Sequence, residues 1–547
     1  MTNKNLAKLA AIFVVPALMA ACGSAATPRP IAQEPATTNT QSSYAPTAAP
    51  AMPRPTDAPK PAAPTAAPYA APAAESRAYP PAAPGGVMPV RPTPIPPDNQ
   101  FKDAGINPPV NAGRDHLSTF GLDVDTASYS MAKEYLRKGQ LPPYASVRAE
   151  EFINAFKQGY PTPRDVAFGI YADGALSPFH TDGSYLVRVG VQGYRVPDSQ
   201  RKPGAYVFVV DESGSMSMDN RIDLARQSLK MLVGQLREGD TVGIVAFTTT
   251  SREVLQPTPA EQRDVINRAI DSIVPKASTN LQSGLMMGYA MANRAFRAGA
   301  ANRVILLSDG VANEGGIKPD EILTSVQEFA RRGIALTSVG VGFGNYNDTL
   351  MEKLADQSEG GNYLYINTLA DAEKQFAAKV SGLQNIARDA KVQVDFNADA
   401  VQTYRLIGYE NRAVADQDFR NDSVKGGGLS AGHTATAIYQ VTLKPGAAGR
   451  IATVNLRWND PDTNQTKEIN GNVNVSDLSR RFDEAAPRFQ LAAVVAQFAE
   501  VLRQSPYASR ASLGDLSERA SALAGQLSDD NDVREFAQLA TQAARVR

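Results

Sequence analysis

Cysteine and histidine are nearly missing from this chain of 547 residues. The single cysteine, Cys22, rules out an intrachain disulfide and a zinc site built from several thiolates. Only three histidines are present, and none of them neighbours a recognisable serine motif. A formal net charge of -1 gives no broad electrostatic attraction for nucleic acid or anionic membrane. A Walker A loop is also absent, so the sequence does not predict nucleotide binding.

The N-terminus carries an apolar run that is too short to span a bilayer. Lys4 and Lys8 precede Leu9–Ala21, and the run ends in Leu18-Met-Ala-Ala-Cys22. This pattern is typical of a secretory signal, and its last residues resemble a bacterial lipoprotein box. The resemblance implies removal of residues 1–21 and a lipid on Cys22, which would anchor the chain extracytoplasmically to the cell membrane or outer membrane. The alternative is ordinary signal cleavage that leaves Cys22 as a free thiol.

Residues 22–112 differ in composition from the rest of the chain. The stretch from Pro28 to Pro109 holds 22 of the 38 prolines, mixed with alanine, threonine and serine. Such a composition cannot bury a core and favours extended polyproline segments. We therefore expect a disordered stalk that holds the folded part away from the membrane.

Residues 201–385 alternate strands and helices. The predicted strands are rich in apolar residues, and the first is an unbroken apolar run that predicts burial on both faces. They are Ala205–Val210, Val242–Phe247, Arg303–Leu307, Ile334–Val341 and Tyr363–Ile366. This order predicts an α/β fold with a doubly wound, mostly parallel sheet covered by helices on both faces.

Two regions flank the α/β segment. Residues 113–200 predict two short helices and two alternating strands, and residues 386–480 predict a β-rich module that these strands could complete. Residues 481–547 have helical periodicity and predict a packing bundle. The helices and strands predicted in the first region are Ser128–Arg137, Ser146–Phe156, Val166–Tyr171 and Tyr185–Val191.

Oxygen-bearing side chains cluster at the predicted strand ends. The first strand ends in Asp211-Glu-Ser213-Gly-Ser215, the third ends in Ser308-Asp309, and Thr279 lies in a loop directly before a helix. In such a sheet, ligands bind at the carboxyl ends of the strands, and hard oxygen donors suit a small divalent cation. Histidine is absent from all three loops, which disfavours zinc, copper or nickel.

This arrangement resembles the metal-ion-dependent adhesion site of von Willebrand factor type A (VWA) domains. That site takes Asp-x-Ser-x-Ser, a threonine and an aspartate from three loops, which here are Asp211, Ser213, Ser215, Thr279 and Asp309. The resemblance implies a bound Mg²⁺ (or Mn²⁺ or Ca²⁺) with an open or water-filled coordination position. It also implies a protein partner that presents a glutamate or aspartate to that position. The flanking regions resemble the N-terminal extension and C-terminal module of one bacterial subgroup of VWA lipoproteins.

Three acids near the predicted ligands have other interpretations. Glu212 alternates away from the ligands and is predicted to lie at the rim of the site or to be structural. Asp219 and Asp223 could support an adjacent calcium site, as the corresponding acids do in some relatives. Acids at these positions also favour the start of a helix.

The sequence is compatible with two rival functions: a phosphatase that would use other residues, and a scaffold that would use the same five ligands. Asp123-Val-Asp125-Thr126 also looks like the start of a haloacid-dehalogenase-type phosphatase. The strand before it is short and contains Gly121, so a helix N-cap near Asp125 or Thr126 explains these acids more simply. A scaffold whose metal only stabilises the fold would use the same five ligands. The sequence favours a non-enzymatic, lipid-anchored binding protein.

Overall fold

The computed structural model describes residues 101–276, 279–310, 319–343, 348–358, 360–377, 383–508 and 511–546. These residues belong to one compact unit of the chain. The predicted signal segment, Cys22 and most of the predicted stalk lie outside the described residues. Among the helices of the described ranges, none combines the length and the apolar character that crossing a membrane requires.

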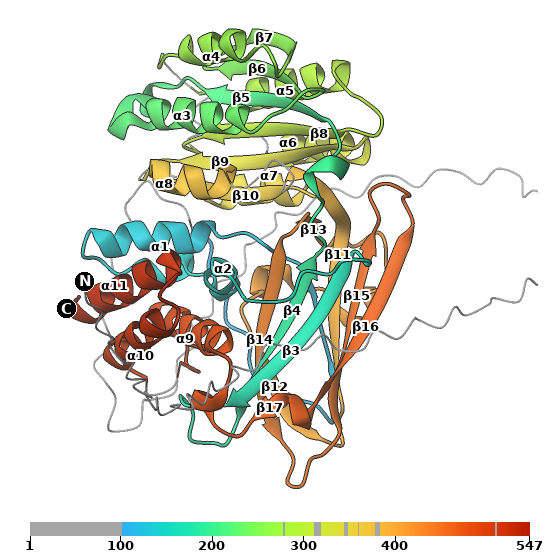
Figure 1. Cartoon of the computed structure of the whole chain (residues 1–547), viewed down its shortest axis with the longest axis vertical. Helices are drawn as coiled ribbons and strands as arrows, with labels where there is room; N and C mark the ends of the chain where they lie inside the picture. Colours follow the sequence, from blue (N-terminus) through green and yellow to red (C-terminus); the bar gives the residue numbers. More distant parts are fainter. Residues whose placement is uncertain are drawn as a thin grey trace, which may run out of the picture. The chain divides into compact units, whose positions relative to one another are not determined.

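The α/β segment is built on a six-stranded sheet (Figure 1). Its strand order is β10 (Asn362–Ile366), β9 (Ile334–Val341), β8 (Ala301–Ser308), β5 (Gly204–Asp211), β6 (Thr241–Phe247) and β7 (Ser251–Pro259). Neighbouring strands pair in parallel, except that β7 is antiparallel to β6. Strand β5 lies between β6 and β8, so the winding of the chain reverses there. The predicted doubly wound, mostly parallel sheet is confirmed.

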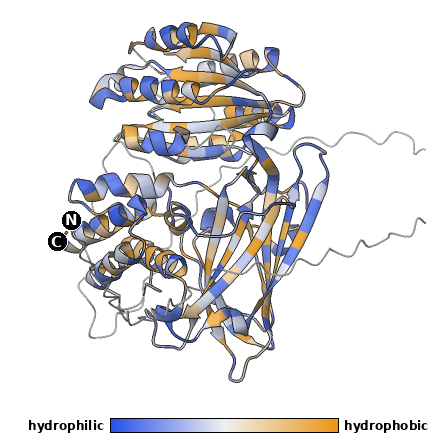
Figure 2. Ribbon diagram, viewed as in Figure 1, coloured by the Kyte–Doolittle hydropathy of each residue, from blue (hydrophilic) through white to orange (hydrophobic). Residues whose placement is uncertain are grey.

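Helices cover both faces of this sheet. They are α3 (Arg221–Gly234), α4 (Arg263–Asp271), α5 (Leu281–Arg294), α6 (Pro319–Arg331), α7 (Asp348–Asp356) and α8 (Leu369–Ala372). Every residue of β5 is buried, with Phe208 in the core on one face and Val209 in the core on the other. Figure 2 shows the apolar residues concentrated in the strands of this sheet and polar residues on the covering helices. Burial on both faces explains the unbroken apolar runs in the sequence.

Strand β7 is an element that the sequence pattern does not predict. Its residues, Ser251–Pro259, show no strict alternation and include Pro257 and Pro259. The strand lies at the edge of the sheet, and among the strands that the structure describes it pairs with β6 alone. Proline is tolerated on an edge strand because one side of the backbone needs no hydrogen-bond partner.

The two flanking regions contribute strands to the same sheets. The first sheet has the order β1 (Val110–Asn111), β12 (Val401–Ile407), β14 (Thr434–Leu443), β4 (Tyr185–Gly193), β3 (Phe168–Leu176) and β17 (Leu478–Ser479). The second contains β13 (Gly427–Ser430), β11 (Asn385–Phe396), β15 (Arg450–Asn459) and β16 (Thr466–Asn474), with β2 (Leu117–Gly121) paired to β11. The prediction that the strands near 166–191 complete the C-terminal module is confirmed by the pairing of β4 with β14. Since β1 pairs with β12, the folded part begins ahead of residue 113.

A separate helical core joins the two ends of the folded region. It contains residues of α1 (Ala127–Arg137), α2 (Ala149–Asn154), α9 (Pro487–Leu502), α10 (Leu513–Gln526) and α11 (Asn531–Arg545). The predicted C-terminal helices are therefore confirmed. The helix expected from Ser146 begins at Ala149, because a short 3₁₀ turn occupies Tyr144–Ser146.

Candidate metal site

Asp211 lies at the carboxyl end of β5 and is fully buried. Its Oδ1 accepts a hydrogen bond from the backbone N–H of Ser213 at 2.8 Å, and its Oδ2 accepts one from the Ser308 hydroxyl at 2.7 Å. Ser308 ends β8, the parallel neighbour of β5. The parallel pairing therefore brings the first and third predicted loops together at one edge of the sheet.

Ser213 and Ser215 face each other on the loop that follows β5. Their hydroxyl oxygens lie 3.0 Å apart. Ser213 is buried, whereas Ser215 is partly exposed. The two hydroxyls of the Asp-x-Ser-x-Ser motif thus converge in space, and one of them can reach solvent.

Asp309 is the second carboxylate of the site, and it is also fully buried. Burial and then the charge of Asp309 raise the pKa of Asp211 to about 7, against the hydrogen bonds from Ser308 and Ser213, which lower it. A nearby positive charge stabilises the ionised form of a buried carboxylate. The pair therefore favours a cation.

Arg221 supplies one such charge, and the sequence analysis missed it. Its guanidinium is buried and donates from Nη1 to Asp309 Oδ2 and from Nη2 to the Phe343 carbonyl, both at 2.8 Å. Gly342 leaves the space for it, since a Cβ there would lie 2.6 Å from Arg221 Cγ. Arg221 is the first residue of α3, where the helix dipole disfavours a cation. An arginine at the first position of a helix is unfavourable, and this is the one feature of the sequence that indicates an acidic partner for Arg221.

Thr279 occupies the second predicted loop. It is 1% exposed, and its hydroxyl has no hydrogen-bond partner among the residues that the structure describes. The loop is tied to the first one, because the Lys276 N–H donates to the Glu212 carbonyl at 2.6 Å. A buried hydroxyl without a partner costs free energy, and a bound cation would offset that cost by taking the hydroxyl oxygen as a ligand.

The five predicted residues fit a hard divalent cation. They offer two carboxylates and three hydroxyls, and oxygen ligands of this kind suit Mg²⁺ or Ca²⁺. In the described part of the chain, no group of three or more histidine, cysteine, aspartate or glutamate side chains is placed to hold a metal ion. The fit therefore depends on the hydroxyls, above all on the unsatisfied hydroxyl of Thr279.

Asp219 and Asp223 have different surroundings in the structure. Asp223 lies in the first turn of α3 and forms an ion pair with Arg226 at 2.8 Å. Asp219 is exposed and has a left-handed backbone, with φ of 48°. Asp223 thus has the role of an acid at the start of a helix.

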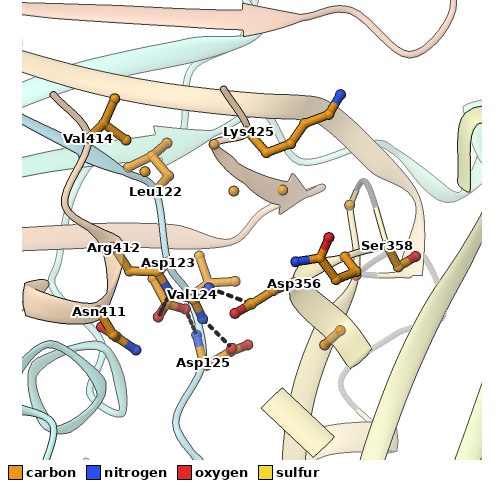
Figure 3. Close-up of a pocket in the computed structure, with 18 of the residues that line it drawn as sticks. Leu122, Asp123, Val124, Asp125, Asp356, Ser358, Asn411, Arg412, Val414 and Lys425 are labelled. Atoms are coloured by element: carbon orange, nitrogen blue, oxygen red, sulfur yellow. Dashed lines mark hydrogen bonds and ion pairs between the residues drawn. The ribbon is translucent and has the colours of Figure 1, made fainter. Parts of the chain in front are cut away.

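Asp123 and Asp125 lie elsewhere, on the wall of a cavity of about 200 Å³ (Figure 3). Arg412 contacts both of them, at 2.9 Å and 3.3 Å respectively, and also contacts Glu352 at 3.5 Å and Asp356. Burial and then the charge of Asp123 raise the pKa of Asp125 well above its usual range, although Arg412 opposes the shift. These acids and Arg412 form an ion-pair cluster that links the N-terminal region (residues 113–200), α7 and the C-terminal module.

The helix N-cap predicted near Asp125 or Thr126 is confirmed in position, because α1 begins after Thr126, but the acids do not act as caps. Thr126 is the N-cap of α1, but its side chain makes no capping hydrogen bond, and Asp125 Oδ1 accepts from the backbone N–H of Tyr363 instead. The phosphatase interpretation places its nucleophile after a strand of a parallel α/β sheet. Here, however, the strand before Asp123 is β2, which pairs antiparallel with β11.

Three family models match consecutive parts of the chain. "von Willebrand factor" matches residues 96–188, and "von Willebrand factor type A domain" matches residues 207–379. "Uncharacterized protein YfbK, C-terminal" matches residues 381–546. The second match contains all five residues of the candidate site.

Among similar proteins, YfbK of Escherichia coli (strain K12) is 32% identical over 455 residues, which cover 78% of this chain and 77% of YfbK. Inter-alpha-trypsin inhibitor heavy chain H3 of Mus musculus is 30% identical over 167 residues, 29% of this chain but only 18% of the heavy chain. A solved structure, "von Willebrand factor type A from Catenulispora acidiphila", has a TM-score of 0.41 at 16% identity and covers 68% of this chain and 89% of its own. The chain belongs to the family of Escherichia coli YfbK, bacterial proteins in which a VWA domain precedes a YfbK C-terminal module.

Proposed function

We propose that this protein binds a partner protein by capturing an acidic side chain at a Mg²⁺ site on the VWA domain. VWA domains generally mediate protein–protein interaction. Asp211, Ser213, Ser215, Thr279 and Asp309 would hold the ion. The observation that carries the proposal is the buried Thr279 hydroxyl, which lacks a partner among the described residues in a site that already holds two carboxylates.

The charges of the site favour an acidic ligand. Asp211 and Asp309 bring two negative charges when ionised, and Arg221 returns one positive charge through its ion pair with Asp309. When bound, a divalent cation acts as a Lewis acid for one more oxygen ligand and leaves one net positive charge. A single carboxylate from a partner would bring the net charge of the site to zero, whereas a neutral or basic side chain would leave it positive.

A pull-down from the native cell envelope tests this proposal. The full chain, with a crosslinker, should capture a partner in Mg²⁺ but not in EDTA, and the crosslink should map to an aspartate or glutamate of the partner. Asp211→Ala should capture nothing under either condition. Capture that is indifferent to EDTA would favour the scaffold whose metal is only structural.

A phosphatase assay tests the rival that uses Asp123. Our proposal expects no difference in phosphate release from a generic ester between the wild type and Asp123→Asn. Release that is lost in Asp123→Asn but kept in Asp211→Ala would replace the binding function by the enzymatic one.

We further propose that the protein acts at the cell envelope. The support is in the sequence: a predicted N-terminal signal over residues 1–21, directly followed by Cys22 and the proline-rich stretch to residue 112. An acyl chain on Cys22 would anchor the protein, and the stalk would extend by at most ~3 Å per residue. Metabolic labelling with a palmitate analogue should mark the wild type but not Cys22→Ser. Equal labelling of both would contradict the anchor.

A further inference from the structure

Glu212 organises positive charge beside the candidate site. It stands between the predicted ligands Asp211 and Ser213, yet its own side chain is only 1% exposed. Its carboxylate forms ion pairs with Arg252 and with Lys276, the latter at 2.9 Å. The prediction that Glu212 has a rim or structural role agrees with these contacts.

The two cations reach solvent although Glu212 does not. The side chain of Arg252 is 41% exposed and that of Lys276 is 45% exposed. Two cations share one buried carboxylate, so this group keeps an excess of positive charge. Both come from elements next to the site, Arg252 from β7 and Lys276 from the loop that leads to Thr279. An acidic partner would meet this charge as it approaches the metal site.

Two large apolar side chains are exposed on the same loops. Val274 is 44% exposed, and its N–H donates to Glu212 Oε1 at 3.3 Å. Met218 is 45% exposed and lies three residues after Ser215, in the Gly214–Asn220 stretch. Methionine is enriched at protein–protein interfaces, which makes Met218, with Val274, a candidate contact for an apolar residue of a partner.

We propose that Met218, Arg252, Val274 and Lys276, here called the rim, select a protein segment with two acidic residues and one apolar residue. This inference rests on the proposed function. One acid would enter the Mg²⁺ site, the second would meet Arg252 and Lys276, and the apolar residue would pack on Met218 and Val274.

The proposal includes a spacing for the partner's residues. Glu212 lies between the ligands Asp211 and Ser213 in the chain, and the Lys276 N–H donates to the Glu212 carbonyl at 2.6 Å, so the rim belongs to the same loops as the ligands. In an extended segment, side chains at alternate positions share one face and repeat every ~7 Å. We therefore expect the two acids to be two residues apart, with the apolar residue at the next alternate position.

Labelled synthetic peptides test the selection. Leu-Ser-Asp-Ser-Asp carries both acids, and Leu-Ser-Asp-Ser-Asn carries one. Fluorescence anisotropy with the full chain in Mg²⁺ should show the two-acid peptide binding about three- to tenfold more tightly, the range expected for exposed ion pairs that reinforce one another. The preference should weaken as the salt concentration rises, since both cations are exposed.

Three variants locate the preference. Lys276→Gln should bring the two peptides to nearly equal affinity, because Glu212 and Arg252 then leave no excess positive charge. Lys276→Arg should keep the preference, which separates loss of charge from misfolding. Arg332→Gln is the matched control, because Arg332 is also an exposed cation, 51% exposed, but precedes β9 at the opposite end of the strands.

The outcomes separate this inference from the proposed function. Equal binding of both peptides by the wild type, or an undiminished preference in Lys276→Gln, would overturn the selective rim while leaving the Mg²⁺ site intact. If neither peptide binds in a Mg²⁺-dependent way, the proposed function fails and the inference fails with it. Met218→Ser should reduce the advantage of Leu-Ser-Asp-Ser-Asp over Ser-Ser-Asp-Ser-Asp, and an unchanged advantage would remove the apolar contact from the proposal.

Discussion

Replacing Arg221 by glutamine should raise the affinity of the site for Mg²⁺ and destabilise the protein when Mg²⁺ is removed. Arg221 is 2% exposed and donates to Asp309 Oδ2 at 2.8 Å. Glutamine keeps a donor group but removes the positive charge. The two buried carboxylates Asp211 and Asp309 would then lack the positive charge of Arg221, and a bound divalent cation would supply the missing charge.

The size of both effects follows from the burial of the pair. Breaking a buried ion pair by removing one partner costs about 3–5 kcal/mol of unfolding free energy. Two unit charges 4 Å apart interact by about 4 kcal/mol at an effective dielectric constant near 20, and a divalent ion doubles that figure. Relaxation and solvent reduce the repulsion between Arg221 and the metal. A gain of about 1.4 kcal/mol, or tenfold in affinity, is therefore a conservative expectation.

Thermal unfolding of the full chain during a Mg²⁺ titration measures both effects. In EDTA, Arg221→Gln should unfold at a lower temperature than the wild type. Its unfolding temperature should increase more on addition of Mg²⁺, and half of that increase should occur at an about tenfold lower Mg²⁺ concentration than in the wild type. Arg226→Gln is the matched control on the same helix, where Arg226 pairs with Asp223, and it should respond as the wild type does. A folded Arg221→Gln protein that gained no more from Mg²⁺ than the wild type would refute the charge argument.

Two other substitutions test a metal ligand and a buried acid separately. Thr279→Val removes the buried hydroxyl without changing the volume, so it should leave the unfolding temperature in EDTA equal or higher but diminish the gain from Mg²⁺; a full gain would exclude Thr279 as a ligand. Burial, then Glu410 and Asp123, raise the pKa of Glu150 from 4.5 to about 7. The folded state thus keeps a proton that the unfolded chain releases, and stability falls by about 3 kcal/mol as pH rises from 4.5 to 7. Glu150→Gln should lose this dependence in chemical unfolding at about pH 4 and about pH 8, on either side of this range, and parallel curves for variant and wild type would contradict the assignment.

The sequence predicted the α/β sheet and its strand ends because the information there is local. Strands β5 and β8 contain the apolar runs Ala205–Val210 and Val304–Leu307, each followed within two residues by an aspartate, and parallel neighbours must bring those ends together. Strand β7 escaped prediction because an edge strand buries little and its sequence need not alternate. The pairing of β4 with β14 was predictable only as a possibility, since nothing local specifies a partner so far along the chain.

The charged residues that complete the sites were beyond sequence analysis for the same reason. Arg221 binds Asp309, 88 residues away, and Arg412 binds Asp123, 289 residues away. Neither pairing leaves a periodic pattern in the sequence. The structure therefore changed the interpretation of two acidic motifs: Asp309 has a built-in counter-ion, and Asp123 belongs to an ion-pair cluster that joins parts of the fold.

The most direct test of the Mg²⁺ site compares thermal unfolding of the wild type and Asp211→Ala in Mg²⁺ and in EDTA. The wild type should unfold at a higher temperature in Mg²⁺ than in EDTA, because the ion binds only the folded site. Asp211→Ala should unfold at the same temperature in both buffers. If Asp211→Ala gained as much from Mg²⁺ as the wild type, the metal would bind elsewhere and the proposed adhesion site would be wrong.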